Sequence, residues 1–177
     1  MITTVGDKID VLSRLSVFAQ RTGAGPQRLT ANQTAAATGV IPKATDSTWA
    51  LEVVGRARSV RLTRDQLIAM AQRTATLPIA CVEGWSVSAE WQGVALRDLL
   101  ALVDEPPTRV RLTSLEHSVY GSSDVSSQLA AHPDTLVALR LNGEQLDVDH
   151  GYPARLIAPN RPGAMQTKWL ERIEVLG

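Results

Sequence analysis

The sequence lacks the features that define several large classes of protein. It contains one cysteine, which excludes an internal disulfide framework and any zinc or iron–sulfur site built from several cysteines. Lysine plus arginine and aspartate plus glutamate each number 18, so no net charge favours nucleic acid or an anionic membrane. No run approaches the roughly 20 apolar residues that span a bilayer, and no signal peptide is recognisable at the N-terminus. Any anion-binding site must therefore be a local cluster of cations.

The chain is long enough for one domain with a substantial core, and its two parts differ in composition. Its 177 residues are 44% hydrophobic and 20% charged, which is ordinary for a soluble globular domain. Residues 22–45 are dominated by Thr, Ala, Gly, Gln and Pro, a composition typical of a linker that lies on a domain without building its core. Residues 7–20 have apolar side chains at helical spacing. We therefore expect an N-terminal arm over 1–45 and the functional domain over 46–177.

From residue 46 onward, short alternating stretches of apolar and polar residues predict β-strands separated by turns. Asn142-Gly143 is the strongest of these signals, because both residues tolerate the left-handed backbone of a tight hairpin turn, and it predicts a hairpin over 136–148. Further strands are expected at 49–55, 77–85, 109–115, 154–159 and 169–176.

Two helices are expected beside these strands. Within 60–73 a strand leads into a helix that Thr63 caps. The inward residues of this helix are expected to be Leu67, Ile68 and Ala71. A second helix is expected over 94–103, before two prolines. Because strands and helices do not alternate regularly, the expected fold class is α+β, with mixed β-sheets and a few covering helices.

Cys81 is the first candidate for chemistry, and its position allows more than one interpretation. A lone cysteine at the end of an apolar strand is commonly a small buried hydrophobe. The same position, just before a turn, also suits a reactive thiolate surrounded by loops. A nucleophilic cysteine with a histidine as its base is a third interpretation, and no spacing in the sequence favours it. The candidate bases are His117, His132 and His150.

A cluster of cations and a tyrosine are the other candidates. Around turns rich in proline and glycine the sequence gathers four basic residues, His150, Arg155, Arg161 and Lys168. They are either separate surface cations or parts of a concave anion site, since arginine forks and a lysine suit a phosphate. Tyr120, which precedes Gly-Ser-Ser, is either part of a plain turn or a phenol at the mouth of a pocket.

Three segments in this order resemble the molybdenum-cofactor domain of the sulfite-oxidase family. CVEGWSVSAEWQGVALRDLL (81–100) resembles the cysteine segment of that family, and most of all that of its bacterial methionine-sulfoxide-reductase branch. YGSS (120–123) is similar to the loop with the active-site tyrosine. LNGEQLDVDHGYPARLIAP (141–159) and GAMQTKWL (163–170) resemble the pterin-binding stretch and the closing strand. The resemblance extends from Thr48 to Leu176 and implies the fold of this family, with molybdopterin as the cofactor.

The resemblance implies a role for each candidate residue. Cys81 would supply the thiolate that completes the sulfur ligands of molybdenum, a soft donor for a redox metal. Tyr120 would lie at the substrate face of the metal, and Asn32 in RLTANQTA (28–35) would contact the pterin. The pterin and its phosphate would be held by His150, Arg155, Arg161 and Lys168. The implied reaction is a two-electron oxygen-atom transfer whose chemistry the cofactor carries.

Two features of the sequence modify what the resemblance implies. Sulfite oxidases have an arginine a few residues after the metal-binding cysteine, whereas this chain has Glu83 in that stretch. A carboxylate there favours reduction of a neutral sulfoxide or N-oxide over oxidation of anionic sulfite. The chain also ends at Gly177, without the immunoglobulin-like dimerisation domain of many family members, so we expect a monomer.

The resemblance also bears on partners and location. We expect a small-molecule or methionine-sulfoxide-like substrate, electrons from a haem or membrane subunit, and no nucleic acid. Because relatives with this ending often follow membrane-spanning helices, the domain is expected to be tethered at the extracytoplasmic face of a bacterial membrane. The alternative is a cofactor-free binding or assembly domain that keeps the fold, since fold alone does not fix function.

Overall fold

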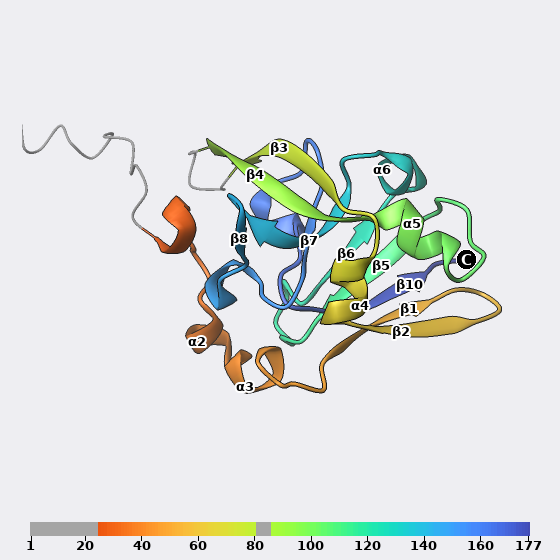
Figure 1. Ribbon diagram of the computed structural model, residues 1–177, viewed down its shortest axis with the longest axis horizontal. Helices are drawn as coiled ribbons and strands as arrows, with labels where there is room; N and C mark the ends of the chain where they lie inside the picture. The colour runs from red at the N-terminus through yellow and green to blue at the C-terminus, as the bar shows by residue number, and fades with distance from the viewer. Residues whose placement is uncertain (1–24, 81–85) are drawn as a thin grey trace, which may run out of the picture.

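The computed structural model describes residues 25–80 and 86–177, which form two β-sheets with short helices around them (Figure 1). The first sheet has the strand order β2-β1-β10-β5-β6 and consists of Ala50–Val54 (β1), Ser59–Thr63 (β2), Val110–Ser114 (β5), Ser122–Val125 (β6) and Leu170–Val175 (β10). The second has the order β3-β4-β7-β8, with β9 also paired to β7, and consists of Arg73–Ala80 (β3), Ser86–Ala95 (β4), Leu136–Leu141 (β7), Glu144–Gln145 (β8) and Arg155–Ile157 (β9). The expected α+β class with mixed sheets is confirmed.

The last strand along the chain, β10, lies at the centre of the first sheet. It pairs in parallel with β1 and antiparallel with β5, which makes this sheet mixed. In β1 the side chains of Leu51 and Val53 are fully buried, while those at positions 50, 52 and 54 are half-buried. This alternation follows from the two-residue period of a strand and turns one face of the sheet to the core.

The second sheet is buried on both faces at its centre, along β7. Along β7, Val137 and Leu139 belong to the core shared with the first sheet, whereas Leu136 and Ala138 belong to a second apolar cluster on the opposite face. A strand buried on both sides is expected to be continuously apolar rather than alternating, as LVAL is. The second cluster contains Trp91 and underlies the cavity described below.

The helices are short and lie around the sheets. They are Pro26–Arg28 (η2), Ala35–Thr38 (α2), Ile41–Ala44 (α3), Arg64–Ala69 (α4), Leu96–Ala101 (α5), Ser127–Ala131 (α6), Val148–His150 (η3) and Gly163–Met165 (η4). Thr63 caps α4 as predicted, in a reciprocal capping box with Gln66. Leu67 is buried, but the inward placement of Ile68 and Ala71 is wrong, because α4 ends at Ala69 and both side chains are exposed.

The predicted hairpin is confirmed, and the structure contains two strands, β4 and β6, that were not predicted. Asn142 has φ 51° and Gly143 has φ 79°, the left-handed backbone that a tight hairpin turn requires. The helix expected from residue 94 begins only at Leu96, because the two residues before it complete the ten-residue strand β4. The stretch 122–125, for which no strand was predicted, forms β6.

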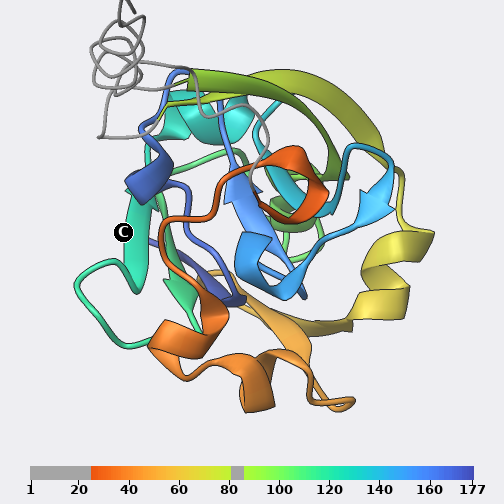
Figure 2. The ribbon, with the colours of Figure 1, turned by 90° about the vertical axis from the view of Figure 1, so that its left-hand side faces the viewer.

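The segment that precedes α2 differs from the expected arm in its packing. We refer to residues 26–34 as the strap; in Figure 2 it runs, coloured red to orange, across the face turned toward the viewer. Leu29 in the strap and Ala35, Val40 and Ala44 after it are buried in the apolar clusters. The expectation that 22–45 does not build the core is therefore wrong for these residues, because small apolar side chains can fill gaps between larger ones. The helix expected over 7–20 lies outside the described residues.

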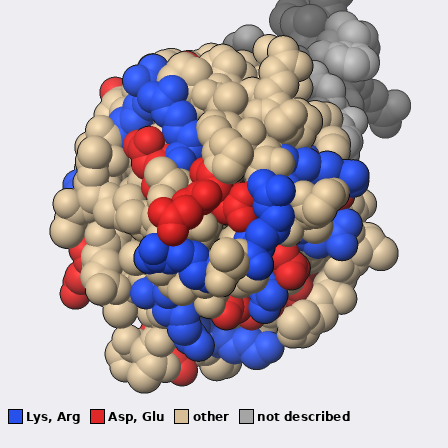
Figure 3. All heavy atoms as spheres, turned by 90° about the vertical axis from the view of Figure 1, so that its right-hand side faces the viewer, with Lys and Arg blue, Asp and Glu red and all other residues tan. Residues whose placement is uncertain are grey.

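The face around the β1–β2 hairpin carries charges of both signs (Figure 3). Ion pairs between described residues join Arg58 to Asp104 at 3.0 Å and both Arg109 and Arg111 to Asp124 at 2.7 and 2.8 Å. Because the two signs are intermixed, this face presents no extended field of one sign. Among the described helices, none has the length and apolar character needed to cross a membrane.

Candidate cofactor-binding site

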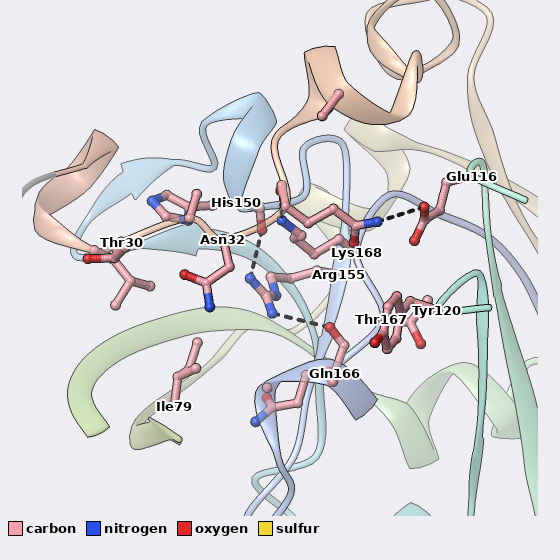
Figure 4. Close-up of a pocket in the computed structure, with 16 residues that line it drawn as sticks. Thr30, Asn32, Ile79, Glu116, Tyr120, His150, Arg155, Gln166, Thr167 and Lys168 are labelled. Atoms are coloured by element: carbon pink, nitrogen blue, oxygen red, sulfur yellow. Dashed lines mark hydrogen bonds between the residues drawn. The ribbon is translucent and has the colours of Figure 1, made fainter. Parts of the chain in front are cut away.

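A cavity of about 430 Å³ lies where the strap faces β3, β9 and the segment before β10 (Figure 4). It is lined by 29–33, Ala37, Ile79, Glu116, Tyr120, His150, Arg155, Gly163, Ala164 and 166–168. Residues far apart along the chain thus surround one space. Five of the candidate residues from the sequence line it, namely Asn32, Tyr120, His150, Arg155 and Lys168.

Gly151 lets three of these side chains come together. Its φ is +109°, in the left-handed region that glycine tolerates and other residues rarely adopt. A Cβ at this position would lie 2.9 Å from Cβ of Arg155 and 3.2 Å from Cβ of Lys168. The chain can therefore turn sharply after His150 and pack the next two cations closely against the turn.

Arg155 is a buried cation for which the described residues provide no anionic partner. Its side chain is 5% exposed, and its Nη1 and Nη2 donate to the carbonyl oxygens of His150 and Gln166 at 3.0 and 3.2 Å. The guanidinium lies over the ring of Trp91, 5.1 Å from its centre, and Nε has no hydrogen-bond partner among the described residues. Burial lowers the pKa of Arg155 from 12.5 to about 9, so the side chain stays charged at neutral pH.

Lys168 is a second cation in the same wall. Its Nζ donates to the carbonyl oxygens of Gln33 and Asp149, the latter at 2.8 Å, and lies over the ring of Trp169. Burial, together with the nearby charge of Arg155, lowers the pKa of Lys168 from 10.5 to about 7, while the carboxylates of Asp149 and Glu116 act in the opposite direction. At neutral pH the ammonium is therefore only partly populated in the cofactor-free fold.

His150 completes the basic side of the cavity. It is 2% exposed, and its Nε2–H donates to the carbonyl oxygen of Pro26 at 2.6 Å. Burial lowers the pKa of His150 below 6.5, with further lowering by the charges of Arg155 and Lys168, while the bond to Pro26 acts in the opposite direction. We therefore assign His150 as neutral at physiological pH, with its proton on Nε2.

This arrangement fits an anion. No carboxylate among the described residues lies within ion-pair distance of Arg155 or Lys168, although both are largely withdrawn from water. A buried cation without a counter-charge costs free energy, and a bound phosphate would offset that cost through charge-assisted hydrogen bonds. The free Nε–H of Arg155 is one donor that a ligand could use. The residues present therefore suit the phosphate of a pterin cofactor.

The low pKa of Lys168 predicts how stability depends on pH. Between about pH 7 and 10 the unfolded chain holds a proton on this lysine that the folded chain has released. The free energy of unfolding should then rise with pH in this window, by up to about 1.4 kcal/mol per pH unit from one group. Below about pH 7 the folded chain also holds this proton, and the cost of the partly buried charge then lowers its stability in full. Urea unfolding of the cofactor-free chain across this range should give a flatter pH profile for Lys168→Met than for the wild type.

The control for this measurement is Lys43→Met, which removes an exposed lysine. It should keep the wild-type profile. A Lys168→Met profile as steep as that of the wild type would show that burial does not suppress the charge of this lysine.

The other side of the cavity carries the carboxylate of Glu116, the phenol of Tyr120 and the hydroxyl of Thr167. Glu116 is 5% exposed and accepts hydrogen bonds from Gln33 Nε2 at 3.1 Å and Ser118 Oγ at 3.0 Å. Tyr120 lies on the same loop, between β5 and β6, and is 55% exposed. Figure 4 shows it beside Thr167, at the end of the cavity away from His150. A ligand would therefore meet cations at one end and a polar, solvent-accessible end at the other.

Two candidates from the sequence are not among the residues that line the cavity. Arg161 is buried, but its Nη1 donates to the carbonyl oxygen of Asp124 at 2.9 Å. It follows β9 by only four residues, yet the turn at 158–162 directs it toward β6. Cys81 lies outside the described residues, although β3 brings Ile79, two positions before it, into the cavity wall.

Several lining residues were not found from the sequence. Gln33, Glu116, Gln166 and Thr167 are polar residues in loops without a motif of their own. Gln166 and Thr167 lie within GAMQTKWL (163–170) and Gln33 within RLTANQTA (28–35), two segments that the sequence analysis singled out without giving these side chains a role. Among the described residues, no group of three or more His, Cys, Asp or Glu side chains could hold a metal ion.

Comparison with known proteins decides the family. Residues 38–177 match the family described as the oxidoreductase molybdopterin binding domain. The chain belongs to this family. The predicted family and the predicted cofactor, molybdopterin, are thereby confirmed.

Three curated relatives illustrate the range of this family. Mitochondrial sulfite oxidase of Drosophila melanogaster is 28% identical over 162 residues, covering 76% of this chain and 28% of that protein. The protein-methionine-sulfoxide reductase catalytic subunit MsrP of Gluconobacter oxydans is 32% identical over 146 residues, covering 72% and 47%. NADH nitrate reductase of Spinacia oleracea is 32% identical over 171 residues, covering 77% and 18%. The chain therefore spans less than half the length of each, and their names refer to different substrates.

A solved structure supports the fold. The sulfane dehydrogenase SoxCD of Paracoccus pantotrophus superposes with a TM-score of 0.67 at 24% identity, covering 73% of this chain and 38% of that one. The predicted fold, that of a sulfite-oxidase-like molybdenum-cofactor domain, is confirmed.

Proposed function

We propose that this domain is a molybdopterin-dependent oxidoreductase that transfers an oxygen atom in a two-electron reaction. The observation that supports this most is a buried cation, Arg155, beside a half-buried one, Lys168, in the wall of one cavity, neither within ion-pair distance of a carboxylate among the described residues. A charge withdrawn from water without a counter-charge costs free energy, and a ligand that supplies the opposite charge offsets that cost. In a chain of this family that ligand is molybdopterin.

The residues of the cavity divide into a binding end and a reaction end. Arg155 and Lys168 would hold the phosphate of the cofactor, His150 would fix the strap against it through Pro26, and Asn32 would contact the pterin. When bound, the molybdenum–pterin group would supply the redox chemistry and accept or release the oxygen atom. At the reaction end Tyr120 is exposed enough to touch a substrate, and it can donate one hydrogen bond to the transferred oxygen.

We propose Cys81 as the protein ligand to molybdenum. The support is its place in the sequence, directly after β3, whose Ile79 lines the cavity. A thiolate is a soft, electron-donating ligand that suits a redox-active metal.

Metal and pterin analysis would test the function directly. Chain produced in a host that makes molybdenum cofactor should carry close to one molybdenum and one pterin per molecule. A folded product that contains neither, from cells in which another molybdoenzyme is fully loaded, would contradict the proposal.

We further propose a neutral S-oxide or N-oxide as the substrate. Glu83, two residues after Cys81, would repel sulfite by about 1 kcal/mol at 4 Å in water-like surroundings and by several where solvent screens less. A neutral oxide pays no such penalty, and its reduction consumes two electrons and two protons and releases water. The lining at the reaction end adds a second carboxylate, Glu116.

An assay with an artificial electron donor would test this preference. We expect reduction of a sulfoxide such as methionine sulfoxide, or of an N-oxide, and little oxidation of sulfite. Glu83→Gln should raise the rate of sulfite oxidation about fivefold or more, since it removes the repelling charge, and should leave reduction of the neutral oxide within about twofold. Rapid sulfite oxidation by the wild type, unchanged in Glu83→Gln, would overturn the substrate proposal.

Partners and location remain predictions. We propose that a haem or membrane subunit supplies electrons and that the domain works as a monomer, tethered at the extracytoplasmic face of a bacterial membrane. Fusion of topology reporters to the gene in its native host would test the location.

A further inference from the structure

One glutamine outside the cavity holds the strap to the rest of the fold. The Nε2 of Gln27 donates to the carbonyl oxygens of Gln145 at 2.9 Å and Leu141 at 3.3 Å. Its Oε1 accepts from the backbone N–H of Asp147 at 2.9 Å. A single side chain thus connects the strap to three backbone groups around the β7–β8 hairpin, more than 110 residues away along the chain.

The backbone of Gln27 is held in the same place. The side chain of Asn142, in the hairpin turn, donates from Nδ2 to the carbonyl oxygen of Gln27 at 3.2 Å. The Oδ1 of Asn142 accepts from the N–H of Glu90 in β4 at 3.1 Å, which fixes the orientation of this amide. The turn that the sequence predicted therefore also serves as an attachment point for the strap.

The local backbone of the strap depends on these contacts. Gln27 has φ 54° and Arg28 has φ 63°, so two consecutive residues other than glycine adopt the left-handed region. Such a pair costs free energy and persists only where surrounding contacts impose it. Without the bonds to Gln27, this part of the strap would return to more favourable backbone angles.

The strap matters for the cavity because residues 29–33 form one of its walls. The far end of this wall is attached by Lys168 to the carbonyl oxygen of Gln33, and by the N–H of Ala35 to Asp149 Oδ1 at 2.8 Å. A phosphate that binds Lys168 competes with the first of these contacts. The attachment at Gln27 does not involve the cavity, so it would remain when the cavity is filled.

We propose that Gln27 is a positioning residue for the cofactor: it holds the wall 29–33 in place and thereby slows release of the molybdopterin. This inference rests on the proposed function, because it assumes that the cavity holds the cofactor. Gln27 itself does not line the cavity and acts only through the strap.

The matched variants are Gln27→Ala and Gln72→Ala. Gln72 also uses one side chain to bind several backbone groups, donating to the carbonyl oxygens of Leu67 at 2.8 Å and Met70 at 3.0 Å. Those bonds secure the end of α4 and not the strap. The two variants therefore remove similar numbers of hydrogen bonds from different places.

The first measurement uses the cofactor-free chain and limited digestion with trypsin. Arg28 is exposed, so cleavage after it reports opening of the strap, and mass spectrometry identifies the fragment that begins at Leu29. Gln27→Ala should be cut there about tenfold faster than the wild type, a change that corresponds to loss of roughly one to two net hydrogen bonds. Gln72→Ala should be cut at the wild-type rate.

The second measurement follows release of molybdopterin from the loaded chain by the fluorescence of the oxidised pterin. Gln27→Ala should release the cofactor about tenfold faster, and Gln72→Ala at the wild-type rate. Equal cleavage after Arg28 in all three proteins, or faster cleavage with unchanged release, would overturn the inference. A wild-type chain that never binds molybdopterin would instead overturn the proposed function on which the inference rests.

Discussion

Replacing Arg155 with methionine should weaken the binding of molybdopterin by at least tenfold and leave the cofactor-free fold close to its original stability. The guanidinium is buried against Trp91, where a methionine of similar length can pack. The lowering of its pKa from 12.5 to about 9 corresponds to a few kcal/mol of penalty for the charged form, which the substitution removes. The carbonyl oxygens of His150 and Gln166 lose their donors, and that cost is of similar size with opposite sign.

The loss of binding has no such compensation. Each charge-assisted hydrogen bond to the phosphate is worth about 1.5–3 kcal/mol, so affinity should fall by at least tenfold and by more than a hundredfold at the upper end. Thermal unfolding of the cofactor-free chain and the molybdenum and pterin content of the loaded chain measure the two effects separately.

The control is Arg58→Ala, because Arg58 and its partner Asp104 are 53% and 74% exposed and contribute little to stability. Arg56 is a poorer choice, since it pairs with the buried Glu105, which its removal would leave alone. Full cofactor content in Arg155→Met would exclude this side chain from the anion site.

Cys81→Ser should abolish turnover, and metal retention should fall with it. Serine keeps the volume of cysteine but replaces a soft thiolate with a hard hydroxyl that is barely ionised at neutral pH. Molybdenum content and turnover with an artificial donor measure the effect, and circular dichroism with thermal unfolding checks that the fold is intact. Cys81→Ala is the companion variant, which should behave in the same way. Normal turnover with normal metal content in either variant would remove Cys81 from the metal centre.

The elements that could be predicted from the sequence are those that local interactions determine. The N-cap at Thr63 and the turn at Asn142-Gly143 each depend on residues within three positions of one another, and both were predicted. The inward placement of Ala71 was wrong because α4 ends at Ala69, and the position where the helix ends depends on the strands that follow it. Helical spacing gives no information about that point.

In the candidate site, too, local features could be predicted and properties that depend on distant residues could not. Arg155 and Lys168 were recognised as cations near turns, but the sequence could not show that no carboxylate of the described part of the chain lies within ion-pair distance of them, which is the property that indicates a ligand. Arg161 was grouped with them through proximity in sequence, whereas the turn after β9 directs it toward Asp124. The strap was expected only to lie on the domain, because the contacts of Gln27 join residues more than 110 positions apart.

The central place of β10 in the first sheet has a consequence for synthesis of the protein. During translation β1 emerges early, yet its parallel neighbour is β10, which leaves the ribosome more than a hundred residues later. Until then β1 and β5 each have an edge that stays unpaired, and the cavity wall at 166–168 does not exist. The nascent chain therefore has to be kept from aggregating through these open edges. It can acquire its cofactor only after synthesis of the domain is complete.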